Sequence, residues 1–271
     1  MLEYITVFGR TLPMYGIMAV LGFLVGLGAA CLRCKAFGLS KENCVYIMAF
    51  GGVGAAIGAK IVYILTVLPD FIKDLGLITT NFNLFFEKYI ASGMVFYGGL
   101  IGAVAASVLF CKYMKIRLSD YLTVLVPSFA LIHAFGRVGC FFAGCCYGIE
   151  MPEGLGVTFT HSRFAPNNVS LFPVQLVEAG CEIVIFILLT ILAHRAKDGV
   201  TILAGYVFLY APIRFVLEFF RGDVVRGFLF GLSTSQWISI LAVFLAALCL
   251  FLYERKNRNA PSHKNNSENN T

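Results

Sequence analysis

Three basic residues, Lys60, Arg137 and Arg214, stand inside long apolar stretches, where charges are rare. A charge at the centre of a membrane helix costs about 2.5–3.5 kcal/mol even on the most lenient scale, so such residues usually face a cavity and serve function. The planar fork of an arginine matches two oxygens of a phosphate or a carboxylate. We therefore predict a site that recognises such an anion, with a structural ion pair as the alternative for any one residue.

Carboxylates and other polar side chains are spaced so that they can join these cations. Glu218 follows Arg214 by four residues and can pair with it on one helix face, and Glu178 and Glu182 share the same spacing. We predict catalytic roles for Arg137, Arg214, Glu218 and Glu178. We predict substrate-binding roles for Tyr15, Lys60, Tyr97, Gly98, Gly99, Gln175, Tyr210 and Gln236.

Three cysteines, Cys140, Cys145 and Cys146, follow His133 and Arg137 along the same stretch. Their C-x4-C-C spacing is not a standard zinc pattern, and we predict neither a bound metal nor a cofactor. Three interpretations stay open: small side chains that only pack, a disulfide on an oxidising face, or thiols with catalytic or metal-binding work.

The elements that must position these residues are membrane helices. The chain is 59% hydrophobic and 13% charged, with a mean hydropathy of +0.81, whereas a soluble protein needs more polar surface. A spanning helix needs about 20 apolar residues. We predict an all-α, polytopic membrane protein with helices at 12–32, 44–68, 92–111, 121–143, 173–193, 199–219 and 234–253. Residues 1–253 are expected to form one transmembrane domain, followed by a polar, disordered tail at 254–271.

The distribution of Lys and Arg predicts an N-terminus outside and a C-terminus in the cytoplasm. Twelve of the 21 basic residues fall in segments on the side of the tail, six on the other side and three within spans. In this orientation Lys60, Arg137 and Arg214 each lie about 15 residues, or roughly 23 Å, from the inner end of a helix. They are expected to share one level in the outer half of the membrane. Scattered basic loops favour contact with anionic membrane lipid and not with nucleic acid.

Two outer segments and three glycine pairs complete the pattern. Residues 69–91 could form an interfacial helix or a simple connecting loop, and residues 148–172 could face a protein substrate. Glycines four residues apart predict close packing of helices, and these pairs are Gly22 with Gly26, Gly54 with Gly58, and Gly98 with Gly102.

Five short motifs occur in order along nearly the whole chain. They are Leu12-Pro-Met-Tyr15-Gly16, Gly93-Met-Val-Phe-Tyr97-Gly-Gly-Leu-Ile-Gly102, Gly136-Arg137-Val-Gly-Cys140-Phe141, Pro173-Val-Gln175-Leu-Val-Glu178 and Arg214-Phe-Val-Leu-Glu218-Phe-Phe-Arg221. In the order and spacing of these motifs the chain resembles the prolipoprotein diacylglyceryl transferase family. The family's important arginines match Arg137 and Arg214, its opening tyrosine matches Tyr15, and its glutamate after the second arginine matches Glu218.

The resemblance implies a seven-helix enzyme of the bacterial plasma membrane with its active site toward the outer face. In that family a diacylglyceryl group passes from phosphatidylglycerol to the signal-peptide cysteine of a lipoprotein precursor, and glycerol phosphate departs as a thioether forms. The alternatives are a related phospholipid-dependent transferase with a different acceptor, and a membrane thiol or redox protein that uses Cys140, Cys145 and Cys146.

Several positions depart from the pattern of the family it resembles. Tyr97 stands where His is usual, Lys60 where Arg is usual, Cys140 and Ala143 where Asn is usual, and Cys145 where Glu is usual. An often proposed base is therefore absent, and Tyr97 is expected to donate hydrogen bonds instead. The proton of the attacking thiol is expected to pass to Glu178, Glu182 or Glu218.

Overall fold

Long helices form most of the chain in the computed structural model, which describes residues 3–7, 10–196, 198–223 and 227–259. Seven helices in this described part are long and apolar enough to cross a membrane, which confirms the predicted all-α class. They are α1 (Met14–Cys34), α2 (Lys41–Thr66), α6 (Phe96–Tyr113), α7 (Leu118–Ala143), α8 (Val174–Ala196), α9 (Gly199–Leu217) and α10 (Thr234–Asn259). Lys197, Arg226 and Lys264, which enter the charge count, lie outside the described residues.

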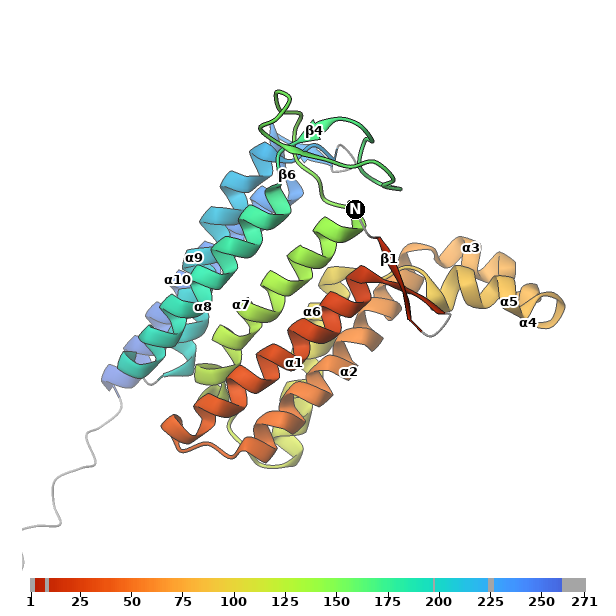
Figure 1. The fold of residues 1–271 in the computed structure, drawn as a ribbon. Helices are drawn as coiled ribbons and strands as arrows, with labels where there is room; N and C mark the ends of the chain where they lie inside the picture. Colours follow the sequence, from red (N-terminus) through yellow and green to blue (C-terminus); the bar gives the residue numbers. More distant parts are fainter. Residues whose placement is uncertain (1–2, 8–9, 197, 224–226, 260–271) are drawn as a thin grey trace, which may run out of the picture. The chain divides into compact units, whose positions relative to one another are not determined.

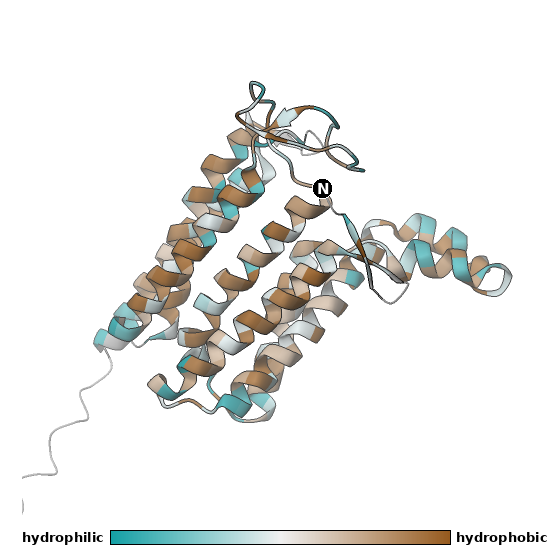
Figure 2. Ribbon diagram, viewed as in Figure 1, coloured by the Kyte–Doolittle hydropathy of each residue, from teal (hydrophilic) through white to brown (hydrophobic). Residues whose placement is uncertain are grey.

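Apolar side chains cover the long helices, and polar ones concentrate at their ends and in the connecting segments (Figure 2). Many large apolar residues on these helices are exposed, among them Leu24, Val53 and Phe244. A water-soluble protein rarely exposes apolar surface on this scale. The exposed faces are therefore the surfaces that contact lipid tails.

The described residues form two compact units, one of residues 1–30 with 122–271 and the other of residues 31–121. In the first unit α9 packs between α8 and α10 (Figure 1). Its helix α1 approaches α7 closely, because a Cβ at Gly22 would lie 2.5 Å from the Cβ of Phe135. The first predicted glycine pair is thus confirmed as a packing surface. A single transmembrane domain over 1–253 stays a prediction.

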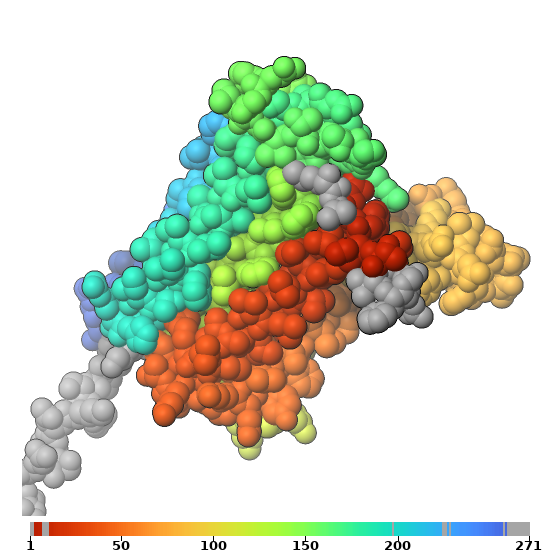
Figure 3. Space-filling view, in the orientation of Figure 1, coloured from red at the N-terminus to blue at the C-terminus, as the bar shows by residue number. Residues whose placement is uncertain are grey.

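Short antiparallel strand pairs stabilise the loops of the first unit. Strands β1 (Tyr4–Val7) and β2 (Arg10–Pro13) form a hairpin, and so do β5 (Phe228–Leu229) and β6 (Leu232–Ser233). Between α7 and α8, β3 (Val157–Thr158) pairs with β4 (Ser170–Leu171) around a small core of Phe159, Ala165 and Leu171. This loop forms a continuous layer over one end of the unit's helices (Figure 3).

In the second unit, α2 and α6 meet along their glycine pairs. A Cβ at Gly102 would lie 2.1 Å from the carbonyl oxygen of Gly54, and one at Gly98 would lie 2.5 Å from that of Gly58. Backbone therefore packs directly on backbone, as small residues allow in membrane helices. The predicted glycine pairs are confirmed, and they pack against each other.

The segment after α2 is helical, but it is not one continuous helix. It is a chain of short helical pieces: α3 (Leu68–Lys73), η2 (Asp74–Gly76), α4 (Leu77–Thr80), α5 (Phe82–Phe85) and the π-helical turn η3 (Phe86–Ala91). Its apolar rings cluster on one side, where Phe71 lies 5.7 Å from Phe85 and 5.1 Å from Tyr89 between ring centroids. An ion pair from Lys88 to Asp74, at 2.6 Å, links its two ends.

The polar tail begins later than predicted. Helix α10 continues to Asn259, so residues 254–259 are helical and not disordered. Glu254 and Arg258 are four residues apart and their charged atoms are 3.9 Å apart, a spacing that supports a helix after its apolar part ends. Residues 260–271 lie outside the described part of the chain.

Changing Gly102 to Ala is expected to lower the free energy of unfolding by about 1–3 kcal/mol, because the new methyl group would overlap the backbone of α2. The matched control is Gly28→Ala, since a Cβ there meets no atom within 4 Å. Thermal unfolding in detergent gives the melting temperature of both variants, and a lower free energy of unfolding lowers this temperature. Equal melting temperatures for the two would contradict this packing.

Candidate functional site

Polar side chains from α7, α8 and α9 meet inside the first unit. Arg137 on α7 pairs with Glu178 on α8, with 2.9 Å between Nη2 and Oε1. The hydroxyl of Tyr210 on α9 donates to the same Oε1 at 2.9 Å. The Glu178 carboxylate is only 2% exposed, so these two partners are what allow it to carry charge there.

A second set of three side chains lies four residues away on each helix. His133 Nδ1 is 2.6 Å from Glu182 Oε1, and the hydroxyl of Tyr206 donates to the same oxygen at 3.1 Å. Residues four apart on a helix stack on one face, so the two sets lie one above the other. Together they form a polar ladder, which we define as His133, Arg137, Glu178, Glu182, Tyr206 and Tyr210.

The second predicted arginine extends this polar face along α9. Arg214 Nη2 donates to Glu218 in the short helix η4 (Glu218–Phe220) and, at 3.2 Å, to the hydroxyl of Ser235 on α10. Tyr210, one turn earlier, is close enough to feel the charges of both Arg137 and Arg214. Both arginines therefore act electrostatically on the same tyrosine.

Each arginine keeps one buried N–H group without a partner. Within the described part of the chain, neither Nε of Arg137 nor Nη1 of Arg214 has a hydrogen-bond acceptor. An unmet buried donor costs about 1–3 kcal/mol, and more when it is charged. An anion with several oxygens, such as a phosphate, is the kind of group that satisfies two such donors.

The three predicted cysteines come together where α7 ends. The sulfur atoms of Cys140, Cys145 and Cys146 all lie within 4.8 Å of one another, and all three cysteines are free thiols. Positive φ angles of 70° at Gly144 and 57° at Cys146 turn the chain back onto the helix end. Sequence spacing left packing, disulfide and reactive thiols open, and the structure has three thiols in contact.

Arg221 adds a further guanidinium at these thiols. Its Nε and Nη2 atoms donate to Asp223 at 2.8 and 2.6 Å, and its side chain also hydrogen-bonds Cys146. Burial lowers the pKa of Arg221, but Asp223 and Cys146 together raise it above its ordinary value. Hydrogen bonds from Cys140 and Cys145, then Arg221 and Arg137, lower the pKa of Cys146, although burial opposes this.

A mostly apolar hollow of about 330 Å³ opens beside the thiols. Tyr15, Ala143, Cys145 and Phe164 contribute to its lining, together with residues of the N-terminal hairpin. Tyr15 is half exposed and close enough to interact electrostatically with Arg137 and all three cysteines. The predicted opening tyrosine therefore stands between a surface hollow and the charged interior.

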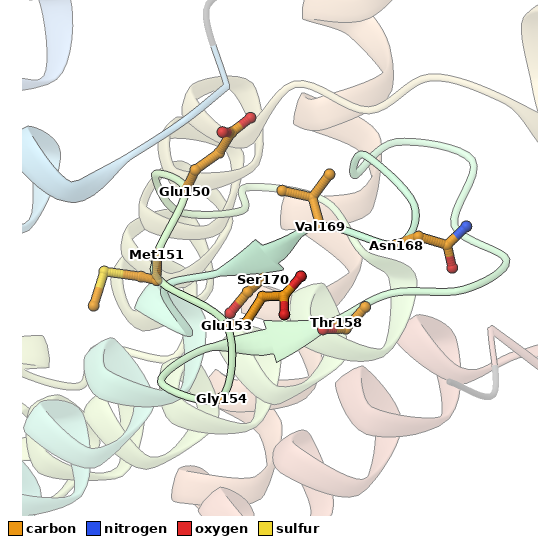
Figure 4. A pocket seen from close by; sticks show the side chains of 8 residues that line it. All are labelled: Glu150, Met151, Glu153, Gly154, Thr158, Asn168, Val169 and Ser170. Carbon is orange, nitrogen blue, oxygen red and sulfur yellow. The ribbon is translucent and has the colours of Figure 1, made fainter.

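A second hollow, of about 480 Å³, lies in the loop between α7 and α8 (Figure 4). It is lined by Glu150, Met151, Glu153, Gly154, Thr158, Asn168, Val169 and Ser170. Its only charged lining residues, all of them in the described part of the loop, are the two glutamates. Acidic lining repels an anionic lipid, so this hollow does not fit the predicted anion site.

Two predicted substrate-binding residues instead hold backbone. Gln175 Nε2 donates to the carbonyl oxygen of Cys145 at 2.9 Å, which fixes the loop that carries the thiols. Gln236 Oε1 accepts from the backbone N–H of Ser233 at 2.9 Å, and its Nε2 donates to the carbonyl oxygen of Phe215 at 3.4 Å. Both side chains are almost fully buried. In this structure both side chains hold backbone, and their predicted substrate-binding roles stay predictions.

Lys60 lies in the second unit and binds backbone carbonyl oxygens. Its ammonium donates to the carbonyl oxygens of Tyr89, Ser92 and Gly93, at 3.3, 2.6 and 2.9 Å. Lys60 therefore fastens the end of the 68–93 segment to α2. Its predicted substrate-binding role stays a prediction.

The other three predicted residues of the second unit begin helix α6. Gly98 packs against the backbone of α2, and a Cβ at Gly99 would lie 3.4 Å from the carbonyl oxygen of Ala55. Their close packing accounts for both glycines without a ligand. Tyr97 is 47% exposed, with its ring edge-on to Phe96. Its predicted hydrogen bond to substrate stays a prediction.

Sequence reasoning missed Tyr206 and left His133 without a role. Both belong to runs of polar residues four apart, and on α9 the run is Tyr206, Tyr210, Arg214 and Glu218. This spacing places one polar stripe along an otherwise apolar helix. The stripe was readable from the sequence, but the partner of each residue was not.

A model of the family described as prolipoprotein diacylglyceryl transferase matches residues 4–253. The phosphatidylglycerol–prolipoprotein diacylglyceryl transferase of Clostridium tetani is 33% identical over 244 residues, which cover 88% of this chain and 92% of that protein. A protein of Clostridium perfringens with the same name and the number 2 is 30% identical over 90% of this chain and 94% of its own length. The Campylobacter hominis transferase is 33% identical over 97% of this chain and 94% of its own length.

Changing Glu178 to Ala is expected to lower the free energy of unfolding by about 3–5 kcal/mol, because Arg137 would stay buried without its counter-ion. Tyr210→Phe removes a single hydrogen bond and should lower the free energy of unfolding by about 1 kcal/mol. Glu254→Ala, which breaks an exposed pair, is the control. Denaturant unfolding in detergent gives the free energy of unfolding of all three variants. Similar losses of stability for Glu178→Ala and Glu254→Ala would contradict the buried ion pair of the polar ladder.

Proposed function

Because the chain belongs to the prolipoprotein diacylglyceryl transferase family, we propose that it moves the diacylglyceryl group of phosphatidylglycerol to the cysteine thiol of a lipoprotein precursor. The chain is a multi-pass membrane protein, so both the lipid donor and the membrane-bound precursor can reach it within the bilayer. The observation that carries the proposal is the pair of buried arginines, each with one N–H group left over.

The arginines bind the phosphate of the donor lipid. Arg137 and Arg214 come from different helices, and both act electrostatically on Tyr210. We propose that one phosphate takes a hydrogen bond from the unpartnered N–H group of each. Arginine keeps its proton in proteins, and its fork binds phosphate oxygens with defined geometry. The surrounding apolar helices exclude water, which strengthens both interactions.

The reaction is a displacement at the glycerol carbon that carries the phosphate. The thiolate sulfur of the acceptor attacks this carbon, so a C–S bond forms as the C–O bond to the phosphate breaks. The electron pair of the C–O bond stays on the phosphate oxygen, and glycerol phosphate leaves. The thiol proton ends on the departing phosphate or in water. Arg137 and Arg214 stabilise the charge that develops on that oxygen.

The predicted catalytic carboxylates act by holding these arginines. Glu178 is bound by Arg137 and Tyr210, and Glu218 is bound by Arg214. Each carboxylate is therefore already engaged by a guanidinium, and we assign neither as the base. Both are positioning residues, because they aim the guanidinium groups at the phosphate.

The orientation follows from the charge distribution, and it belongs to the same proposal. The N-terminus lies outside and the C-terminus in the cytoplasm of a bacterial plasma membrane, because twelve loop and tail cations fall on one side and six on the other. The loop between α7 and α8, which includes Cys145 and Cys146, then faces outward. A lipoprotein precursor presents its cysteine on the same side.

Alkaline phosphatase fusions test this orientation, because the enzyme folds only outside the cytoplasm. Fusions at Gly38 and Lys115 are expected to be inactive, and one at Glu153 is expected to be active. A green fluorescent protein at the C-terminus should fluoresce. The reverse pattern would overturn the orientation.

Arg137→Ala and Arg214→Ala are each expected to lower the rate of transfer by about 10²–10³-fold, because the departing phosphate loses one of two stabilising charges. The assay uses phosphatidylglycerol vesicles and a lipoprotein precursor peptide, with the product identified by mass spectrometry. Arg258→Ala is the matched control, since this residue is exposed on α10.

Full activity of either arginine variant would refute its role. Complementation of a bacterial strain without lipoprotein diacylglyceryl transfer tests the acceptor. If the chain fails to complement but still modifies another thiol or hydroxyl compound in vesicles, the acceptor differs from the one proposed.

A further inference from the structure

The three clustered thiols have no task in the reaction as described so far. Cys140 belongs to the last turn of α7, and Cys145 and Cys146 follow directly. The backbone N–H of Cys145 donates to the carbonyl oxygen of Cys140 at 3.1 Å, which brings the chain back onto the helix. Cys146 has a positive φ angle, a conformation that is rare for residues other than glycine and that concentrates at functional sites.

The spacing of the sulfur atoms suits a thiophilic metal ion. Zinc binds thiolate at about 2.3 Å with tetrahedral geometry, which puts bound sulfur atoms about 3.8 Å apart. The three sulfur atoms already lie within 4.8 Å of one another, so small side-chain rotations are enough to close the site. Three protein ligands leave the fourth tetrahedral position open, as in catalytic zinc sites.

The charges around the cluster compensate such an ion. Zn²⁺ with three thiolates carries one net negative charge, and a fourth thiolate adds a second. Arg221 hydrogen-bonds Cys146, and Arg137 is close enough to act on it electrostatically. Hydrogen bonds to ligand atoms from a fixed outer group tune metal sites, and Asp223 fixes Arg221 through two bonds.

The cluster is also open to a substrate. Cys145 lines the apolar hollow beside Tyr15, so a ligand in that hollow can reach the thiols. Arg137, which binds the phosphate in the proposed reaction, lies near Tyr15 and near the same cysteines. The proposed acceptor site and the proposed phosphate site therefore share Arg137 as a neighbour.

We propose that Cys140, Cys145 and Cys146 form a three-thiolate site for a thiophilic divalent ion, Zn²⁺ in the first instance, whose fourth position takes the acceptor thiol. The acceptor role rests on the proposed function; the metal site itself does not. A thiol bound to such an ion loses its proton, here to water through the hollow, and stays a thiolate at neutral pH. The bound sulfur then forms the C–S bond, and the C–O electron pair goes to the phosphate oxygen.

This site supplies what the carboxylates of the first unit cannot. Glu178, Glu182 and Glu218 are each bound to a cationic or histidine partner, so none is a free base. Metal coordination ionises a thiol without a base.

Zinc content of the purified full-length protein tests the metal site. After expression with added zinc, the wild type should hold close to one zinc ion per chain. The zinc content of the Cys145→Ser and Cys146→Ser variants should fall to the background level. Cys249→Ser, an exposed cysteine on α10, should keep the wild-type value. A wild type without zinc, or the same zinc content in all variants, would overturn the proposal.

Cobalt replacement keeps the test valid even if a cysteine variant fails to fold. Co²⁺ bound by thiolates in the wild type should give a strong sulfur-to-metal absorption band. A precursor peptide with its cysteine should change this band, and the same peptide with serine should not. No band would overturn the site, and a band unchanged by the cysteine peptide would overturn the open fourth position.

Transfer assays separate this proposal from the proposed function. Folded Cys145→Ser protein should lose activity by about 10²-fold or more, the usual range for loss of proton-transfer assistance. If zinc-free Cys145→Ser protein transfers at the wild-type rate, the metal has no part in transfer and the function stands. If zinc binds but no diacylglyceryl product forms, the proposed function fails and the metal site stands.

Discussion

The need to pair charges inside an apolar bundle controls the first unit of this protein. Glu178 is buried and Arg137 is mostly buried, and each would be a costly lone charge, so they pair with each other and Glu178 also accepts from Tyr210. The same requirement joins His133 to Glu182 one turn away. Because these partners come from three helices, the pairs also fix the register of α7, α8 and α9 against one another.

Function arises where this pairing is incomplete. Arg137 and Arg214 are held firmly by their glutamates, yet each has one buried N–H group that no described protein atom accepts. In the proposed function, these unpartnered N–H groups bind the phosphate of the donor lipid and stabilise the charge that develops on it. Beside it, the turn at Gly144 gathers three thiols next to Arg137 and Arg221. The proposed anion site and the cysteine cluster therefore share Arg137 as a neighbour.

The second unit obeys a different constraint, which is close approach of backbone. Gly54 and Gly102 let α2 and α6 pack with almost no side chain between them. Lys60 then uses its charge on carbonyl oxygens at the end of the neighbouring segment, which lack partners of their own in a helix. A cation within an apolar helix can therefore hold backbone as well as a ligand, and its hydrogen-bond partners show which contacts it makes.

The sequence by itself determined the seven helices, the glycine packing surfaces and the pairing of Arg214 with Glu218. Each of these depends on residues near one another in the chain: a run of apolar side chains, a spacing of four, or a small residue on one helix face. Only the tertiary structure decided that Glu178 binds Arg137, that Gln175 holds the cysteine loop and that Lys60 serves the backbone. These contacts join residues about 30 or more positions apart, and their geometry depends on how helices pack, which no local pattern encodes.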